Sequence, residues 1–322
     1  MRRRSLILGS LATTIAADRG ARADGYPSQP IRLVVPFSSG GAPDILARLL
    51  ASEMSASGFG TVVVDNRGGA AGNIGADAVA KAKPDGYTLL LTTTATQSIN
   101  PVLYPAIPYD PEHDFSAIGL VATTPLVLVV GASTKLASIS DLIASAKANP
   151  NVLSYASAGI GTMQHITGEL FSAQAHVEMS HVPYKGSGQV ISDLLAGRVT
   201  VMFNSIAAVS GLVNEGKLRA LAVTASQRLP LWPSVPTVAE VLPGFEASAW
   251  YGMFGPAKLP PDIIAKLNQE VGRIIALPRV RERYAALGLE PVTSTSDELA
   301  SLARRDLAKW SEIIKARNIR VE

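Results

Sequence analysis

The sequence predicts an α/β protein of two lobes that are joined by two crossings of the chain and separated by a cleft. A length of 322 residues suggests about two domains. Short β-branched apolar runs alternate with amphipathic helical stretches, which is typical of mostly parallel sheets flanked by helices. The alternation starts again after a long apolar run that a proline divides, so each part of the chain can build one lobe.

The chain begins with a segment that we expect to be removed. Residues 1–23 combine three consecutive arginines, Arg2 to Arg4, with a short apolar stretch and the A-x-A site Ala21-Arg22-Ala23, which is the pattern of a secretory signal peptide. The apolar stretch is shorter than the roughly 20 residues that a membrane span needs. Arg3-Arg4 also resembles a twin-arginine signal, so the sequence leaves the export route open.

Composition excludes several classes of protein. Residues 1–23 hold five Arg and one Asp, so the remaining chain carries −1 of the total formal charge of +3 and gives no reason to expect nucleic-acid or anionic membrane binding. The chain has no Cys, which excludes disulfides, thiolate metal sites, iron–sulfur clusters and a Cys nucleophile.

The first lobe is predicted to begin with a βαβαβ unit. The expected parallel strands are 31–37, 61–67 and 87–93, and the expected helices between them are 43–54 and 74–83. The apolar run 118–130 is too long for one ordinary strand, and Pro125 divides it. We therefore interpret it as a strand that leaves one sheet and enters another, with a hinge near Thr124-Pro125.

The second lobe is predicted to repeat the alternation. Its expected strands are 152–157, 177–184, 199–205 and 218–224, with helices that include 140–149 and 188–197. The proline-rich stretch 229–238 marks the return, and 247–256 is expected to rejoin the first sheet. Two C-terminal helices are expected, the last from a capping box at Thr295 and Glu298 to about Arg317. The predicted domains are a signal peptide at 1–23, lobe 1 at 24–124 and 225–322, and lobe 2 at 125–224.

Two glycine loops carry the clearest indication of function. PFSSGGAPD (36–44) and ASAGIGTMQH (156–165) each lie between a predicted strand and a predicted helix, where ligands bind in open α/β sheets. The free N–H groups of a helix's first turn attract an anion without any cationic side chain, and glycine lets the ligand approach the backbone. Ser38 and Ser39 add hydroxyl donors, and Thr162 can cap its helix or contact the ligand. A single loop of this kind could be only a tight turn, but two such loops, one in each lobe, favour an anion site.

The residues near these loops do not favour catalysis. The dinucleotide-binding pattern lacks its third glycine, and neither a phosphate loop nor a G-x-S-x-G motif is present. His176, Glu178 and His181 are the only metal-ligand cluster in the sequence, but strand alternation there fits surface or core positions better. His165 could either bond a ligand or merely pack, and Asp44 is well explained by compensation of the helix dipole. We therefore expect a site that holds an anion without reacting it, with no metal and no cofactor.

The motifs from Tyr26 to the C-terminus resemble those of a known family. In order they are VVVDNRGGAAGNIG, PDGYTLL, INPVLYPAIPYDP, SAGIGTMQH, HVPYKGSG, VMFNS, LRALAVT, VPTVAE and WYGMFGP. This series is similar to that of the Bug-type solute receptors of tripartite tricarboxylate transporters. The resemblance implies a two-lobed, type II-like periplasmic binding protein that closes over a carboxylic or dicarboxylic acid, held largely by main-chain amides and ordered water.

The resemblance also implies a set of ligand-binding residues, carried over by position. They are Phe37, Ser38, Ser39, Gly40, Gly41, Asp44, Thr93, Thr94, Gln97, Ser157, Ala158, Gly159, Gly161, Thr162, His165, Asn204 and Ser205. Two departures from the family pattern matter. A diproline is replaced by Ser38-Ser39, and an acidic residue of the MFDN segment is missing from Asn204-Ser205, which favours a plain carboxylate over an amino acid. Lys185 also matches, but a solvated surface lysine explains it equally well.

The expected function is that of a periplasmic receptor and not of an enzyme. A monomer would deliver a small organic acid to membrane transporter subunits through transient contacts, without nucleic acid. The alternatives are an α/β enzyme acting on a phosphorylated or carboxylated metabolite, and a receptor that presents its ligand to a two-component sensor. The sequence leaves open the acid, its affinity and the choice between uptake and sensing.

Overall fold

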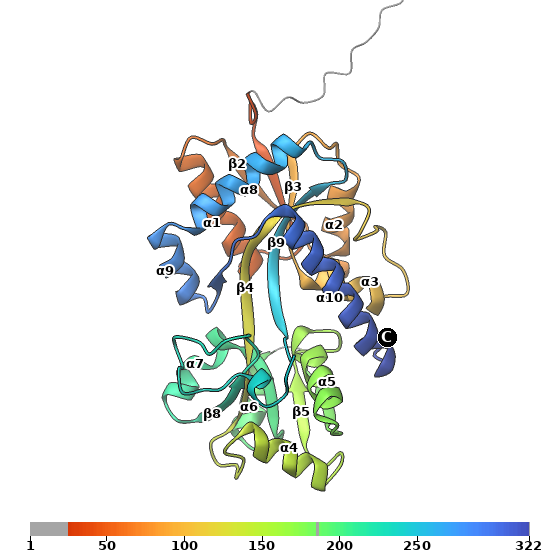
Figure 1. The fold of residues 1–322 in the computed structure, drawn as a ribbon, viewed down its shortest axis with the longest axis vertical. Helices are drawn as coiled ribbons and strands as arrows, with labels where there is room; N and C mark the ends of the chain where they lie inside the picture. Colours follow the sequence, from red (N-terminus) through yellow and green to blue (C-terminus); the bar gives the residue numbers. More distant parts are fainter. Residues whose placement is uncertain (1–24, 185–186, 322) are drawn as a thin grey trace, which may run out of the picture.

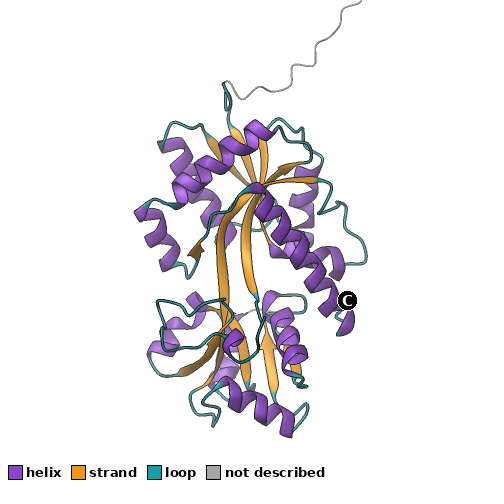
Figure 2. Ribbon diagram, in the orientation of Figure 1, coloured by secondary structure: helices purple, strands orange, loops and turns teal. Residues whose placement is uncertain are grey.

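The protein has two lobes, one above the other in Figure 1, as the sequence predicts. The structure is a computed structural model that describes residues 25–184 and 187–321, so the predicted signal peptide lies outside the described residues. The long strand β4 (Phe115–Gly131) and its neighbour β9 (Ser248–Pro256) run between the lobes. Helices cover the strands in both lobes (Figure 2), and the predicted two-lobed α/β class is confirmed. Among the described helices, none combines the length and apolar character that a membrane span requires.

The upper lobe begins with the predicted βαβαβ unit. β1 (Ile31–Val35) pairs in parallel with β2 (Val62–Asn66) and β3 (Thr88–Thr93), and α1 (Ala42–Ala56) and α2 (Asn73–Ala80) connect these strands, the second after the short turn η1 (Ala70–Gly72). β9 then pairs antiparallel with both β3 and β4, and β10 (Glu290–Pro291) pairs antiparallel with β4. The parallel ladders therefore occupy one edge of a mixed sheet.

Strand β4 is shared by the two lobes. Its ladder with β9 extends to the pair Pro125 and Ser248, and its ladder with β7 (Val201–Ser205) begins at the pair Leu126 and Ser205. β8 (Leu218–Val223) also pairs with this lower part of β4. The prediction of one strand that passes between two sheets at Pro125 is confirmed. The division of the chain into domains at that point stays a prediction, which the change of partner supports.

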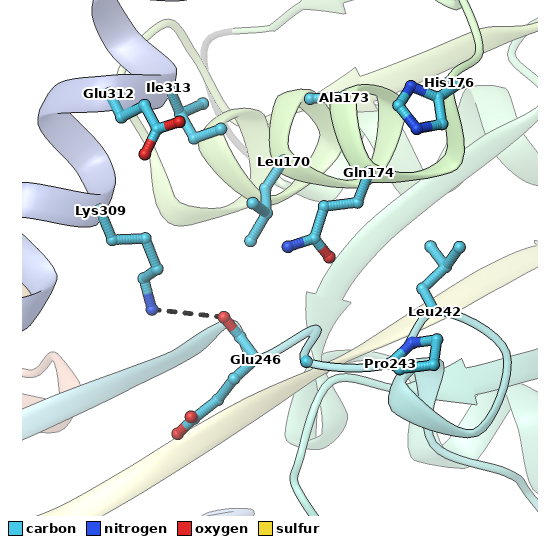
Figure 3. Close-up of a pocket in the computed structure, with 11 residues that line it drawn as sticks. Leu170, Ala173, Gln174, His176, Leu242, Pro243, Glu246, Lys309, Glu312 and Ile313 are labelled. Carbon is cyan, nitrogen blue, oxygen red and sulfur yellow. Dashed lines mark hydrogen bonds between the residues drawn. The ribbon is translucent and has the colours of Figure 1, made fainter.

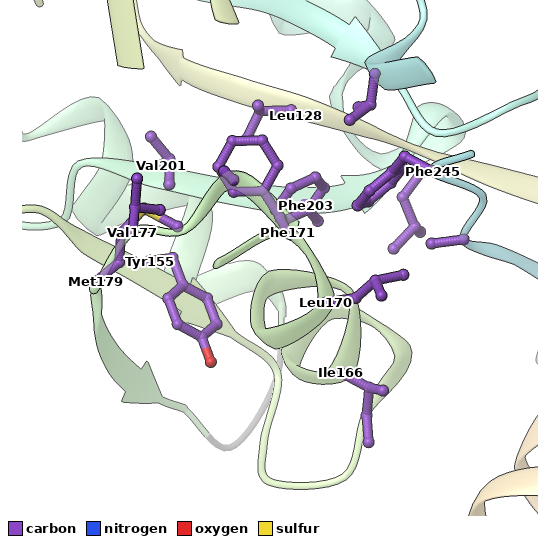
Figure 4. Close-up of a cluster of buried hydrophobic side chains, with 14 of the residues drawn as sticks. Leu128, Tyr155, Ile166, Leu170, Phe171, Val177, Met179, Val201, Phe203 and Phe245 are labelled. Carbon is purple, nitrogen blue, oxygen red and sulfur yellow. The ribbon is translucent and has the colours of Figure 1, made fainter. Parts of the chain in front are cut away.

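The lower lobe is built around one buried helix. β5 (Ser154–Ser157) pairs in parallel with β6 (Ser180–Pro183) and β7, and α4 (Ile139–Ala148), α5 (Met163–Ala175), α6 (Ser187–Leu195) and α7 (Ile206–Asn214) surround this sheet. Figure 4 shows Phe171 of α5 beside Phe203 and Phe245, in an apolar cluster that also contains Ile166 and Leu170 of the same helix. α5 is buried over nearly its whole length because the sheet covers one side and α10 (Ser296–Ala316) the other.

The proline-rich return stretch packs on the lower lobe. Ala225, Leu229 and Trp232 share an apolar cluster with residues of β7 and β8, and Phe245, beyond the short η3 (Val238–Glu240), packs against Phe171. These side chains find their apolar cover there, so the contacts favour a return to the upper lobe at Ala247–Ser248 instead of the expected residue 225.

The C-terminal part contains three helices where the sequence analysis expected two. α8 (Pro261–Ile275) and α9 (Pro278–Ala286) are separate because Pro278 starts a new helix. The predicted capping box of Thr295 and Glu298 is present at the start of α10. α10 packs against β4, against α5 of the lower lobe, and against two short helices that the sequence analysis did not predict, η2 (Ala95–Ile99) and α3 (Asn100–Leu103).

Candidate functional site

The first glycine loop lies exposed between β1 and α1. Ser38, Ser39, Gly40 and Gly41 are solvent-accessible there. Asp44 is only 3% exposed, and its Oδ2 accepts the Gly40 N–H (2.9 Å) and the Arg48 Nε–H (3.1 Å). The Arg48 hydrogen bond lowers the pKa of Asp44, and the Gly40 amide adds to this. Asp44 therefore stabilises the loop and the start of α1, as the dipole argument predicts.

The segment after β3 uses its hydroxyls internally. Thr93 Oγ1 accepts the Ala95 N–H (3.2 Å), Thr94 Oγ1 accepts the Trp250 N–H (2.9 Å), and Thr92 Oγ1 bonds Thr96 Oγ1. A Cβ on Gly72 would lie 2.6 Å from Thr96 and 3.4 Å from the Phe37 ring, so this segment and the residue after β1 both lie close to the turn at Gly72. The segment thus contributes shape and backbone to the site.

Gln97 is placed apart from the other predicted residues. It is 1% exposed and lines a cavity of about 40 Å³ with Phe115, Phe254 and Arg304, a cavity that no other predicted ligand residue lines. Neither of its amide atoms has a hydrogen-bond partner among the described residues. The position within a short π-helical turn directs this side chain toward α10.

The second glycine loop donates its amides to its own side chains. Ala158 N–H donates to Gln164 Oε1 (2.7 Å), Gly159 N–H to Ser157 Oγ (3.2 Å) and Gly161 N–H to His165 Nδ1 (3.1 Å). Thr162 caps α5 by accepting the His165 N–H, and its own amide donates to Gly159 O (3.3 Å). The amides on which the sequence analysis based anion binding are therefore occupied by internal acceptors in this structure.

Two backbone donors near this loop remain available. Among the described residues, the N–H groups of Ile160 and Met163 have no acceptor. Met163 is the first residue of α5, where the dipole favours an anion.

Gln164 joins the glycine loop to the end of β7. Its Nε2 donates to Asn204 Oδ1 (2.7 Å), which also accepts the Ser205 N–H (2.8 Å). Asn204 is 2% exposed, so its side chain holds Gln164 and the Ser205 amide in place and has little surface with which to bind a ligand. The sequence analysis missed Gln164, although its place in the first turn of α5 is a position from which a side chain reaches back to backbone N–H groups.

Ser157 and His181 form a hydroxyl–imidazole pair that the sequence analysis did not anticipate. Ser157 Oγ lies 2.7 Å from His181 Nε2 and also donates to Gly159 O (3.0 Å). Ser157 is fully buried, so its hydroxyl fixes the loop and is not exposed as a nucleophile. The sequence analysis places His181 at the surface or in the core. The register of β6 beside β5 brings it to Ser157, and this register cannot be read from the sequence.

A stack of three rings lies behind the loop. The His165 and His181 ring centroids are 3.8 Å apart, and those of His181 and Tyr155 are 4.8 Å apart. Burial lowers the pKa of both histidines to about 4, so both rings are neutral at pH 7. His165 Nε2 faces Glu169 Oε1 at 3.8 Å.

The two lobes meet at the second glycine loop. Gly161 has φ +77°, and a Cβ there would lie 2.2 Å from Leu103 Cδ2. Leu103 ends α3, which follows directly on the segment after β3. The structure thus brings the loop 157–165 and the strand end at Asn204-Ser205 together in one lobe, and places Gly161 of that loop against Leu103 of the other.

A separate groove lies elsewhere on the molecule. It measures about 600 Å³ between α5, α10 and the stretch 242–246, with Leu170, Leu242 and Ile313 as apolar lining (Figure 3). Lys309 Nζ at its edge donates to Glu246 O (3.3 Å). The predicted ligand residues, all within the described ranges, do not line it. In the described part of the chain, no group of three or more His, Cys, Asp or Glu side chains is arranged to hold a metal ion.

Comparison with known proteins identifies the family. Residues 46–319 match the model of the tripartite tricarboxylate transporter family receptor. The chain belongs to this receptor family. Its relatives include the protein BugT of Bordetella pertussis, which is 37% identical over 98% of this chain and 97% of its own.

Solved structures of the family share this fold. Rpa4515 of R. palustris with adipate is 34% identical, with a TM-score of 0.76 over 92% of this chain and 99% of its own. MatC of Rhodopseudomonas palustris with bound malate is 31% identical, with a TM-score of 0.72 over 90% and 100%. Two further neighbours, 34% and 26% identical to this chain, are described as the periplasmic binding protein BugD and a TctC solute binding protein from Polaromonas. The family and these neighbours are solute-binding receptors and not enzymes, which agrees with the predicted class.

Proposed function

We propose that this receptor captures a small dicarboxylate between the glycine loops of its two lobes and delivers it to the membrane subunits of a tripartite tricarboxylate transporter. The observation that carries the proposal is that two helix-starting loops lie in different lobes, and that Gly161 of the second loop lies against Leu103 of α3 in the upper lobe, which shows that the lobes meet beside this loop. Closure of the lobes brings the start of α1 and the start of α5 toward one ligand, and both helix dipoles favour its negative charge.

The chemistry of the loops supports a dicarboxylate. A ligand with a carboxylate at each end can meet the exposed Ser38-Ser39 loop at one end and the first turn of α5 at the other. Two relatives about one-third identical to this chain have adipate and malate bound, both of which are dicarboxylates. Asn204 is neutral, and this removes an acidic partner that an amino-acid ligand would use.

The place of action follows from the same family. We propose that the receptor is exported by the segment 1–23 and works as a monomer in the periplasm. Neighbours in the family are described as periplasmic binding proteins. Delivery to the transporter then takes place through transient contacts that depend on lobe closure.

Native mass spectrometry of freshly purified protein, followed by thermal shift with a panel of dicarboxylates that includes adipate and malate, tests the proposal. At 100 times the dissociation constant, a bound acid should add about 2.7 kcal/mol to the apparent stability. Every acid should also leave the incubation chemically unchanged. No stabilisation by any mono- or dicarboxylate, or conversion of one of them, would contradict the proposed function.

A further inference from the structure

The hydrogen bond between Gly161 and His165 fixes the protonation of the histidine. The Gly161 N–H donates to Nδ1 of His165 at 3.1 Å. An Nδ1 that accepts a hydrogen bond carries no proton, so the neutral ring has its proton on Nε2, which faces Glu169 Oε1. In this state His165 occupies, as an acceptor, one of the amides that the glycine loop would offer to a carboxylate.

We propose that His165 is a gate for the glycine loop: it holds the Gly161 amide in the ligand-free receptor and releases it, with uptake of one proton, when a carboxylate binds. This inference rests on the proposed function. In the step, the hydrogen bond from Gly161 N–H to Nδ1 breaks and Nδ1 takes a proton from solvent. The Gly161 N–H and the new Nδ1–H then no longer face each other, and each can donate a hydrogen bond to a ligand oxygen.

The surroundings of His165 make this proton depend on the ligand. The ring is 5% exposed and faces His181 and Tyr155 in the stack, Glu169 on its own helix and, through Glu169, the guanidinium of Arg317. Arg317 in turn pairs with Glu178. Burial lowers the pKa of His165 to about 4, so the ligand-free ring stays neutral at pH 7. A carboxylate beside Nδ1 supplies the negative charge that stabilises the imidazolium, and the Glu169 carboxylate, 3.8 Å from Nε2, adds to it.

The neighbouring His181 limits the uptake to one proton. Its ring lies 3.8 Å from that of His165, so a second positive charge would be repelled. His181 also keeps its Nε2 on Ser157, whose hydroxyl holds both backbone groups of Gly159. The geometry thus assigns the titrating role to His165 and the fixed role to His181.

Proton linkage predicts the sign of the pH dependence. Binding that raises the pKa of His165 must tighten as the pH falls, by up to about tenfold per pH unit between the pKa values of the bound and the free receptor. Above the pKa of the bound state, affinity should be independent of pH. The acid's own protonation below about pH 5 acts in the opposite direction, so the comparison is made between variants of the protein.

The test uses calorimetry of adipate and of malate binding between pH 5.5 and 8, in buffers of low and high ionisation enthalpy. The wild type should take up a fraction of a proton per ligand that rises toward one as the pH falls. His165→Asn keeps an acceptor, Oδ1, close to the place of Nδ1 but cannot titrate, so its uptake should vanish and its affinity should change less than about twofold over this range. His113→Asn is the matched control, because His113 is exposed and lies in the upper lobe; it should behave as the wild type.

A second measurement is independent of the variants. In ¹⁵N spectra of the wild-type receptor, the ring of His165 should be the Nε2–H tautomer without ligand, and its Nδ1 and the Gly161 amide should shift together on titration with acid pH or with adipate. Equal proton uptake by wild type and His165→Asn, or no uptake by the wild type while it binds, would overturn the gate and leave the proposed function intact. If neither acid binds, the proposed ligand class fails, and the joint titration of Gly161 and His165 alone decides for or against the gate.

Discussion

Arg317 of the upper lobe forms an ion pair with Glu169 of the lower lobe, with Nε 2.5 Å from Oε2. The other edge of the guanidinium donates to both oxygens of Glu178 at 3.0 Å. Glu169 is only 8% exposed and also accepts the Tyr155 hydroxyl. The end of α10 is therefore tied to the helix that carries the second glycine loop.

Arg317→Ala should destabilise the protein by about 1–3 kcal/mol, because it leaves the buried carboxylate of Glu169 without its cation. Arg320→Ala is the matched control, since Arg320 is exposed and, among the described residues, its guanidinium donates a hydrogen bond to Asn318 and forms no ion pair. Urea unfolding monitored by tryptophan fluorescence measures both. Equal stability of the two variants would show that the ion pair contributes nothing.

Gly161→Ala should lower both stability and dicarboxylate affinity. The new methyl group would meet Leu103 Cδ2 and hold a residue at φ +77°, a combination that costs on the order of 1–3 kcal/mol. Gly40→Ala has a similar φ of +90° but open space around the Cβ, so it should show only the smaller backbone effect on stability. The double variant Gly161→Ala with Leu103→Ala separates contact from strain: if the clash matters, its thermal shift with adipate should recover in part. Identical losses in Gly40→Ala and Gly161→Ala would contradict the interlobe contact.

Stability should fall between pH 6.5 and pH 4 because of the buried histidines. The pKa of His165 and of His181 is about 4 in the folded protein, against 6.5 as the usual value, so in this window the unfolded chain binds protons that the folded protein does not. This destabilisation is absent above pH 6.5 and reaches its full size below pH 4. For His165 it amounts to at most about 3 kcal/mol. Urea unfolding at pH 7.5 and pH 4.5 should show a smaller difference for His165→Asn than for the wild type; an unchanged difference would mean that His165 is not buried neutral.

Asn204→Asp should weaken dicarboxylate binding about tenfold or more without disrupting the site. A carboxylate can still accept the hydrogen bonds from Gln164 and from the Ser205 amide, but it places a negative charge beneath a loop that binds an anion. The neutral substitution Ser205→Asn is the control for changes at the same strand end. Calorimetry with malate gives both affinities, and tighter binding in Asn204→Asp would indicate a cationic group on the ligand.

The mature protein from its own host should begin at Asp24. The arginine-rich start and the Ala21-x-Ala23 site predict cleavage after Ala23. N-terminal sequencing of the periplasmic fraction measures this directly. Cytoplasmic protein that retains Met1 would contradict export and the proposed periplasmic role.

Much of the fold could be predicted because it depends on local patterns. The strands β1, β2 and β3 each contain a short apolar run, and the capping box at Thr295 fixes the start of α10, so the sequence locates these elements within a few residues. The path of residues 225–247 could not be predicted, since Trp232 and Phe245 are apolar in any environment and only the tertiary structure decides which lobe covers them.

The position of the site could be predicted from the sequence, but its side-chain hydrogen bonds could not. Glycine spacing identifies the loop 157–165, but Ser157 meets His181 only through the register of β5 and β6, and Gln164 meets Asn204 only across α5 and β7. The same holds for Gln97, because the direction of its side chain depends on a π-helical turn that the sequence does not predict. Contacts between distant segments therefore account for the differences.

The unbroken course of β4 through both lobes also bears on how the receptor can move. A receptor whose lobes are joined by slack loops can sample many orientations, whereas here the backbone hydrogen bonds of β4 continue on both sides of Pro125. Relative movement of the lobes must then be a bend or twist of a hydrogen-bonded ribbon, and the register shifts of β4 near Gly119, Leu120 and Leu128 are the places where such a ribbon is most easily deformed. We therefore expect the continuous strand to limit the range of angles between the lobes before a solute binds.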